Sequence, residues 1–150
     1  MMSDFEIREA GISELDVIVD YNLALAQESE DKELDRAIVV RGVEQALSKP
    51  ELARYFVAEV DGKVVGQTML TMEWSDWRAG SFWWIQSVYV DAAYRGQGVF
   101  KSIYKYLESL AKADAGCCGL RLYVELENEA AIRTYEKLGM KRAHYYMYEA

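Results

Sequence analysis

Apolar and polar residues alternate, or recur every three to four positions, along most of the chain, and both patterns predict regular secondary structure. Residues 5–8 alternate in the manner of a half-buried strand. Ser13 then stands three residues ahead of Asp16, an approximate capping box that predicts a helix to about Ala26. The acidic residues 28–35 that follow predict a loop.

A second helix and a hairpin come next. Residues 38–47 have helical spacing, and this helix is expected to stop before Pro50. Residues 55–60 and 64–72 have strand character and flank Asp61-Gly62, a dipeptide that tolerates positive φ and fits the twist of a two-stranded hairpin. The chain is therefore expected to open as strand, helix, helix and then to form an antiparallel hairpin.

The C-terminal half predicts two more helices between strands. A third strand follows a loop at 75–80, and an amphipathic helix then ends before Gly116. Asn128 can cap the last helix, and Gly139 supplies the left-handed residue that commonly ends one. The expected elements are 82–90, 100–110, 120–124, 128–138 and a closing strand at 140–148. The order β-α-α-β-β-β-α-β-α-β predicts an α/β (α+β) fold, one mixed sheet with helices on both faces.

Composition narrows the class of protein. The chain has 150 residues, 51% of them hydrophobic and one of them proline, so we expect a single compact domain over residues 1–150. A net charge of −8 disfavours nucleic acid as a partner. No apolar run approaches the length of a membrane span, and the start lacks the features of a signal peptide, so a cytoplasmic protein without membrane contact is expected.

Metal and disulfide chemistry are not expected. Cys117 and Cys118 are adjacent and are the only cysteines, so we expect both to be reduced. His144 is the only histidine, and one histidine beside one cysteine pair supplies no recognisable zinc pattern. His144 is better explained as an ordinary strand residue than as a catalyst.

Residues 92–107 concentrate positive charge inside an acidic chain. They hold three cations, Arg95, Lys101 and Lys105, and no acid. Residues 95–98, Arg-Gly-Gln-Gly, fall between a predicted strand and a predicted helix, where backbone N–H groups converge at the positive end of the helix dipole. The segment could cradle a pyrophosphate, although a glycine-rich turn without a ligand explains this motif alone equally well.

Two other nucleotide-binding motifs fail on spacing. A dinucleotide fingerprint requires glycine at position 101, which is Lys101, and a phosphate loop requires glycine at position 100, which is Phe100.

Three segments in consistent order resemble the GNAT superfamily of N-acetyltransferases. They are residues 85–91 (IQSVYVD), 94–100 (YRGQGVF) and 128–140 (NEAAIRTYEKLGM), and the resemblance spans about residues 53–148. It implies a mostly antiparallel central sheet, acetyl-CoA as cosubstrate, and acetyl transfer to a primary amine of a small molecule or protein. Gly96 and Gly98 match the family's glycine signature, whereas its first position, glutamine or arginine in the family, is Ala93.

The resemblance also implies a set of site residues. In similar enzymes the strand before the loop splays from the following strand, and its backbone at Val88, Tyr89 and Val90 pairs with the pantetheine and the acyl carbonyl. Asn128 matches an asparagine that reaches the pantetheine arm or phosphates. Helix periodicity alone favours Tyr135 as a core aromatic, but the resemblance implies that it matches a tyrosine near the sulfur, the expected catalytic residue. The residues matching the pyrophosphate cradle are Arg95, Gly96, Gln97, Gly98, Val99, Phe100, Lys101 and Ser102.

The acceptor side is less defined. Several similar enzymes place a glutamate base at the position of Gln86; glutamine cannot be that base, so Gln86 is expected to position a water or the substrate. Glu73 is an alternative base or a solvated charge at a strand end. Trp77 and Arg78 lie in the loop before the fourth strand, where we expect them to contact the acceptor.

Two other functions stay open. A non-catalytic acyl-CoA-binding sensor or interaction domain is compatible with Ala93 and Gln86 in place of the family residues. A purely structural α/β domain would respond to no coenzyme A at all. Edge strands in this fold often pair, so a homodimer is possible.

Overall fold

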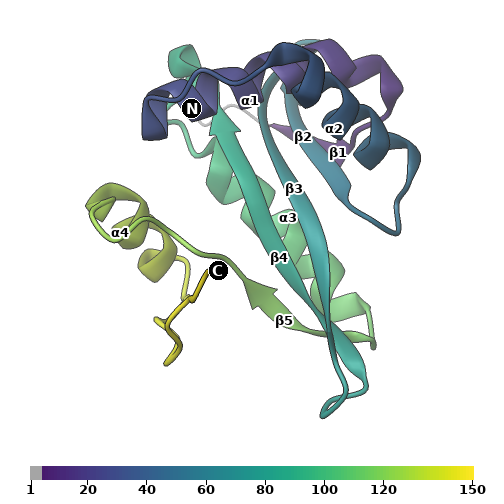
Figure 1. Ribbon diagram of the computed structural model, residues 1–150, viewed down its shortest axis with the longest axis vertical. Helices are drawn as coiled ribbons and strands as arrows, with labels where there is room; N and C mark the ends of the chain where they lie inside the picture. Colours follow the sequence, from purple (N-terminus) through teal and green to yellow (C-terminus); the bar gives the residue numbers. More distant parts are fainter. Residues whose placement is uncertain (1–4) are drawn as a thin grey trace.

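The computed structural model describes residues 5–150 and has one five-stranded sheet with helices on both faces (Figure 1). The sheet order β1-β2-β3-β4-β5 follows the chain; the first four strands are antiparallel neighbours, and β5 pairs parallel with β4. The predicted mixed, mostly antiparallel α/β fold is thus confirmed. The elements are β1 (Glu6–Glu9), α1 (Leu15–Glu30), α2 (Arg36–Ser48), β2 (Arg54–Val60), β3 (Lys63–Ser75), β4 (Gly80–Val90), α3 (Val99–Ala113), β5 (Cys117–Arg121) and α4 (Glu129–Lys137), with 3₁₀ turns at Ile12–Glu14 and Ala92–Tyr94.

Alternation along β2 divides the core between the two faces of the sheet. Phe56 and Ala58 point to the side covered by α3, and they pack in one buried cluster with Ile103 and Leu107. Tyr55 and Val57 point to the other side and pack against residues of α1 and α2, among them Ile18, Val19 and Val43. Helices therefore cover both faces.

Local turn and cap signals hold in the structure. Asp61 and Gly62 both have positive φ, 51° and 77°, and join β2 to β3. The side chain of Asn128 accepts a hydrogen bond from the Ala131 N–H at 3.2 Å and so caps α4. Gly139 follows this helix with a φ of 96°. The turn, the cap and the helix end each depend on residues adjacent in sequence, so the sequence pattern could predict all three.

The start and end of α1 differ from the prediction. The 3₁₀ turn that leads into α1 is held by Glu14, whose carboxylate accepts from the Gly11 N–H at 2.9 Å, and the predicted Ser13–Asp16 capping box does not form. The helix also continues past Ala26 into the predicted loop, as far as Glu30, and residues 31–35 form the loop that remains. Glutamate and glutamine favour helices, and the helix ends only at Asp31, which is left-handed with a φ of 52°.

The last two predicted strands also differ. The fifth strand begins at Cys117 instead of residue 120, because the parallel register pairs Cys117 with Ser81 at the beginning of β4. Residues 140–148 form no strand, so the prediction of a closing strand is wrong. A strand needs a neighbouring strand for its backbone hydrogen bonds, and within residues 5–150 none lies beside this segment.

Gly66 allows α3 to begin close to the sheet. A Cβ at this buried position would lie 2.7 Å from Cγ1 of Val99, the first residue of α3, and 3.4 Å from the Tyr89 carbonyl oxygen. Only glycine therefore fits without displacing the start of the helix.

Candidate functional site

The two parallel strands separate part-way along β4. Their ladder joins residues 81–84 of β4 to β5, whereas β4 itself continues to Val90. Beyond Arg121 the chain runs away from β4 toward α4 (Figure 1). The backbone of residues 85–90 therefore forms an open edge, on which an extended ligand could find hydrogen-bond partners. This is the splay that the family resemblance implied.

A bulge at Ser87 shapes the open edge. Ser87 is left-handed with a φ of 52°, and the β3–β4 register shifts opposite it, between Gln67 and Met69. A non-glycine residue in this region costs about 1 kcal/mol or more, so neighbours must hold it there. The amide of buried Gln67 does so by donating to the Ser87 carbonyl at 3.1 Å and to Asn22 Oδ1 of α1 at 2.8 Å.

The glycine loop lies directly beyond the end of β4. Gly96 and Gly98 have φ values of 78° and 82°, and a Cβ at either would meet no atom within 4 Å. The Ser102 N–H donates to the Gly98 carbonyl at 3.0 Å, which begins the helical ladder of α3. The N–H groups of residues 98–101 precede that bond and lack intrahelical partners. The loop thus offers backbone donors at a helix N-terminus, the requirement of a phosphate site.

Arg95 is engaged within the protein. Its guanidinium binds the Glu28 carboxylate at 2.7 Å and the Val90 carbonyl at 3.0 Å, and it lies 5.3 Å from the centre of the Tyr89 ring. Tyr89 donates to the other oxygen of Glu28 at 2.6 Å. The Tyr89 hydrogen bond, with that of Arg95, holds the pKa of Glu28 below its usual value. Glu28 thus ties the end of α1 to the open edge and the loop.

Tyr135 lies beside the glycine loop. Its ring packs edge-to-face on Phe100, with centroids 5.7 Å apart, and Phe100 belongs to the first turn of α3. Burial raises the pKa of Tyr135, so the hydroxyl remains a proton-bearing donor at neutral pH. The structure therefore brings Tyr135 and the cradle residues together, while Asn128 lies at the N-terminus of the same helix.

The acceptor-side predictions fall at two separate places. The Gln86 amide, beside the bulge, donates to the Thr71 hydroxyl across the hairpin. Trp77 is 90% exposed at the hairpin turn, and the adjacent Arg78 guanidinium lies 5.1 Å from the Phe82 ring centre. The six residue steps of β4 from Gly80 to Gln86 span roughly 20 Å. Only an acceptor that extends along β4 could contact both places in one chain.

Glu73 is held as an ion pair. Its carboxylate accepts from the Trp84 indole at 2.8 Å and from Arg121 at 3.0 Å. The Trp84 hydrogen bond, supported by Arg121, lowers the pKa of Glu73, which weakens it as a base. These contacts therefore favour a structural role for Glu73 at the strand end over a role as the base.

Three residues that hold the bulge and the glycine loop in place, Glu28, Gln67 and Asn22, are not predicted from the sequence. The sequence predicts a loop at Glu28, and nothing in the periodicity marks Gln67 or Asn22 as partners of a bulge. Gln67 is a polar residue at a fully buried strand position, which marks it as important only once the structure shows its burial.

A model of the acetyltransferase (GNAT) family matches residues 16–140. The chain belongs to this family. This GNAT protein is 29% identical to an acetyltransferase of Agrobacterium fabrum over 142 residues, 95% of this chain and 83% of that one. Bovine thialysine N-epsilon-acetyltransferase is 36% identical over 76 residues, 51% of this chain and 44% of its own. The crystal structure of a possible acetyltransferase from Clostridium difficile 630 is 47% identical, with a TM-score of 0.93 over 97% of this chain and 96% of that chain.

Membership makes this protein an acyltransferase, and acetyl-CoA is the cosubstrate of its family. Within residues 5–150, no helix is long and apolar enough to cross a membrane. In the same part of the chain, no group of three or more histidine, cysteine, aspartate or glutamate side chains could hold a metal ion. Cys117 and Cys118 are both free thiols.

Proposed function

We propose that this GNAT protein transfers an acetyl group from acetyl-CoA to a primary amine of a small molecule or protein. The observation that supports the proposal most is the position of the glycine loop. The left-handed turn of Gly96 and Gly98 brings the free N–H groups of α3 to the end of the open edge of β4. Tyr135 packs beside this loop, on Phe100. In this arrangement the amides of residues 96–101 bind the pyrophosphate, and exposed Lys101 adds positive charge. Asn128 contacts the pantetheine arm.

The open edge supplies the electrophilic side of the reaction. The backbone of Val88, Tyr89 and Val90 pairs with the pantetheine, and one amide polarises the thioester carbonyl. The amine nitrogen attacks the carbonyl carbon, negative charge develops on the oxygen, and the carbon–sulfur bond then breaks to release the thiolate. The bulge at Ser87 fixes the direction of these amides before the substrate binds.

Tyr135 assists the leaving thiolate. Ordinary pKa values of about 10 for a phenol and about 8.5 for a thiol make full proton transfer uphill by roughly 2 kcal/mol. Burial raises the pKa of Tyr135 further, so transfer becomes still less favourable. A hydrogen bond from the hydroxyl to the developing sulfur anion is therefore the larger part of its contribution.

An amine acceptor must lose its proton before attack. With a pKa near 10.4, only about one alkylamine in a few thousand is neutral at pH 7. Gln86, anchored on Thr71, positions the acceptor or a water that receives the proton. The bovine relative is named for acetylation of the N-epsilon amine of thialysine, and this supports a primary amine as the acceptor.

The test is the release of free coenzyme A thiol from acetyl-CoA across a panel of amines, with the acetylated product identified by mass. The panel includes polyamines, amino acids, amino sugars and peptides with free N-termini. We expect turnover above the rate of hydrolysis with at least one class. Binding of acetyl-CoA without turnover on any class would instead favour the non-catalytic domain, for which the replacements at Ala93 and Gln86 are the supporting observation.

A further inference from the structure

Three side chains of β4 share one face of the sheet between the hairpin turn and the bulge. Strand alternation places Phe82, Trp84 and Gln86 on this face, and all three are half-buried, so part of each side chain is accessible. Glu73, which lies opposite Phe82 on β3, accepts from the Trp84 indole at 2.8 Å and so confirms the shared face. We call Phe82, Trp84 and Gln86 the β4 row. It ends beside the bulge at which the proposed reaction takes place.

Arg121 of β5 adds a guanidinium group to the same face. It lies in register with Trp84, and its guanidinium carbon is 3.6 Å from the centre of the Phe82 ring. The group also donates to Glu73 at 3.0 Å, and this bond uses one of the five N–H donors of an arginine. A ring and a carboxylate therefore orient the guanidinium before any ligand binds, and further donors can pair with a second carboxylate.

Positive charge exceeds negative charge around the Phe82 ring. A second guanidinium group, that of Arg78, lies 5.1 Å from the ring centre. Glu73 interacts with both arginines, so two positive charges face one negative charge here, in a chain whose net charge is −8. Such a place attracts an anionic group of a ligand and repels a second cation, as in a polyamine.

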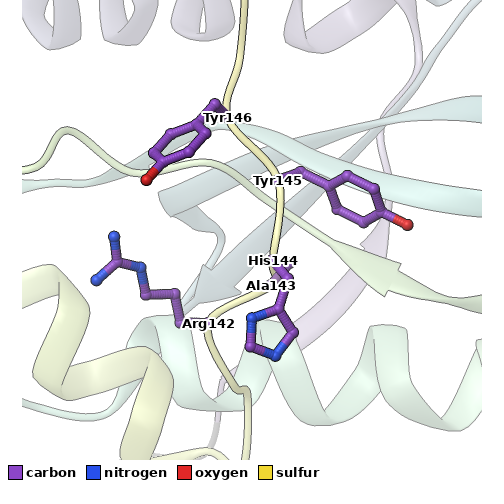
Figure 2. A pocket seen from close by; sticks show the side chains of 5 residues that line it. All are labelled: Arg142, Ala143, His144, Tyr145 and Tyr146. Atoms are coloured by element: carbon purple, nitrogen blue, oxygen red, sulfur yellow. The ribbon is translucent and has the colours of Figure 1, made fainter.

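Arg142 shows how Arg121 differs from an arginine outside such a setting. It lines a pocket with the next residues of the chain, 143–146, and Figure 2 shows their side chains projecting from one extended segment. A single segment therefore forms that pocket. Arg121 of β5 is instead fixed by side chains of β3 and β4, two other strands of the sheet.

The spacing of the β4 row determines the length of a ligand that uses it. Successive row residues lie roughly 7 Å apart, so a guanidinium between Phe82 and Trp84 lies roughly 7–13 Å from the level of Gln86. An amine at Gln86 and an anion at Arg121 must therefore be joined by several methylene groups. The rings of Trp84 and Tyr123, with centroids 6.0 Å apart, offer apolar contacts to such a chain.

We propose that the acceptor is a small amine with a carboxylate at its other end, and that Arg121 binds this carboxylate. The amine lies at Gln86 and the methylene groups lie against Trp84 and Tyr123. The inference rests on the proposed function, because it names the acceptor class of that reaction. The products are the N-acetylated acid, coenzyme A and the proton that the amine loses. Arg121 determines specificity and takes no part in acyl or proton transfer.

Two amines that differ in one charge test the proposal. 6-Aminohexanoate has a carboxylate five methylene groups from its amine, and 6-aminohexanamide has the same length without the charge. For wild type we expect the kcat/KM of the carboxylate to exceed that of the amide by roughly tenfold or more, the usual effect of a hydrogen bond to a charged group. Arg121→Gln should reduce this ratio to about one.

Arg54→Gln is the matched control for Arg121→Gln. Arg54 has a similar setting, because it lies 5.2 Å from the centre of the Phe56 ring and pairs with Glu9 at 2.9 Å. The exposed fractions of the two arginine side chains are also similar, 29% for Arg54 and 31% for Arg121. Arg54 belongs to β2, however, and shares with Phe56 the face that α3 covers. The ratio of this variant should equal that of wild type.

Glu73→Gln should change the ratio in the opposite direction. It removes the carboxylate that competes for the Arg121 guanidinium, so the preference for 6-aminohexanoate should rise several-fold, while the Phe82 ring still orients the arginine. An unchanged or lower ratio would contradict the role of Arg121.

Failure of this inference can be distinguished from failure of the proposed function. Equal kcat/KM values for both amines in wild type, or equal ratios in Arg121→Gln and Arg54→Gln, would overturn the inference and leave acetyl transfer intact. If neither amine is acetylated, isothermal titration of 6-aminohexanoate into the protein saturated with coenzyme A decides the inference separately. Wild type should then bind it at least roughly tenfold more tightly than Arg121→Gln. Equal affinities would overturn the inference.

Discussion

In the proposed mechanism, the leaving-group step depends on the side chain of Tyr135. The neighbouring ring of Phe100 fixes its position, and burial keeps its hydroxyl protonated. Ring and hydroxyl can be separated by experiment, because phenylalanine keeps the packing and removes only the donor.

Tyr135→Phe should lower kcat by roughly tenfold to several hundredfold with little change in acetyl-CoA affinity, since the lost hydrogen bond acts on charge that develops as the thioester breaks. The defect should shrink with an acyl donor whose thiol is more acidic. Steady-state kinetics on both donors and a binding isotherm measure this. Full activity in the variant would remove Tyr135 from the mechanism.

Glu28 acts at the same scale through two other residues. Glu28→Gln removes the charge that holds Arg95, and should raise the KM for acetyl-CoA several-fold because the loop loses its tie to α1. Both partners are partly exposed, so stability should change by less than about 1 kcal/mol. The matched control is Glu30→Gln, because the Glu30 carboxylate pairs with Lys32 across 3.4 Å and not with the loop. Equal KM values in the two variants would exclude a positioning role for Glu28.

At the scale of elements, the site depends on how closely α3 approaches β3. Gly66→Ala would set a Cβ 2.7 Å from Val99, so the helix start must move. Overpacking of this kind should reduce the free energy of unfolding by about 1–3 kcal/mol and weaken cofactor binding. Gly42→Ala, in α2, meets no atom within 4 Å and should instead stabilise by up to about 1 kcal/mol. Denaturant midpoints compare the two; equal midpoints would contradict the close approach.

Among the elements of the fold, the features that the sequence could predict are those that depend on adjacent residues. The hairpin turn at Asp61-Gly62, the Asn128 cap and the loop of Gly96 and Gly98 depend on adjacent residues, and all three are present. The bulge at Ser87 requires Gln67 and Asn22, which are distant in sequence, and no local pattern marks it. Residues 140–148 show the opposite failure, because their alternating pattern predicts a strand but no neighbouring strand in the structure pairs with them.

At the scale of the whole molecule, buried tyrosines make stability depend on alkaline pH. Burial, aided by the charge of Asp91, raises the pKa of Tyr21 to about 12, and burial also raises the pKa of Tyr55, Tyr104 and Tyr135. In the unfolded chain these groups ionise near pH 10. The folded protein then binds more protons than the unfolded one, so stability should fall as pH rises from about 10 to 12.

Thermal unfolding from pH 8 to 12, with phenolate absorbance recorded in parallel, measures this effect. The buried tyrosines should ionise only as the protein unfolds, so their phenolate absorbance should rise together with the loss of structure. A melting temperature that stays constant through pH 11 would contradict the burial of these hydroxyls.

The central claim is that acetyl-CoA binds through the backbone amides around Gly98. Isothermal titration of coenzyme A into wild type and Gly98→Val tests it most directly, with Gly62→Val as the matched control. Both glycines have positive φ, 82° and 77°, and neither has an atom within 4 Å of its Cβ position, so valine strains both backbones alike. We predict that wild type and Gly62→Val bind coenzyme A with similar affinity while Gly98→Val does not bind. Equal binding by all three proteins would contradict the assignment of the loop.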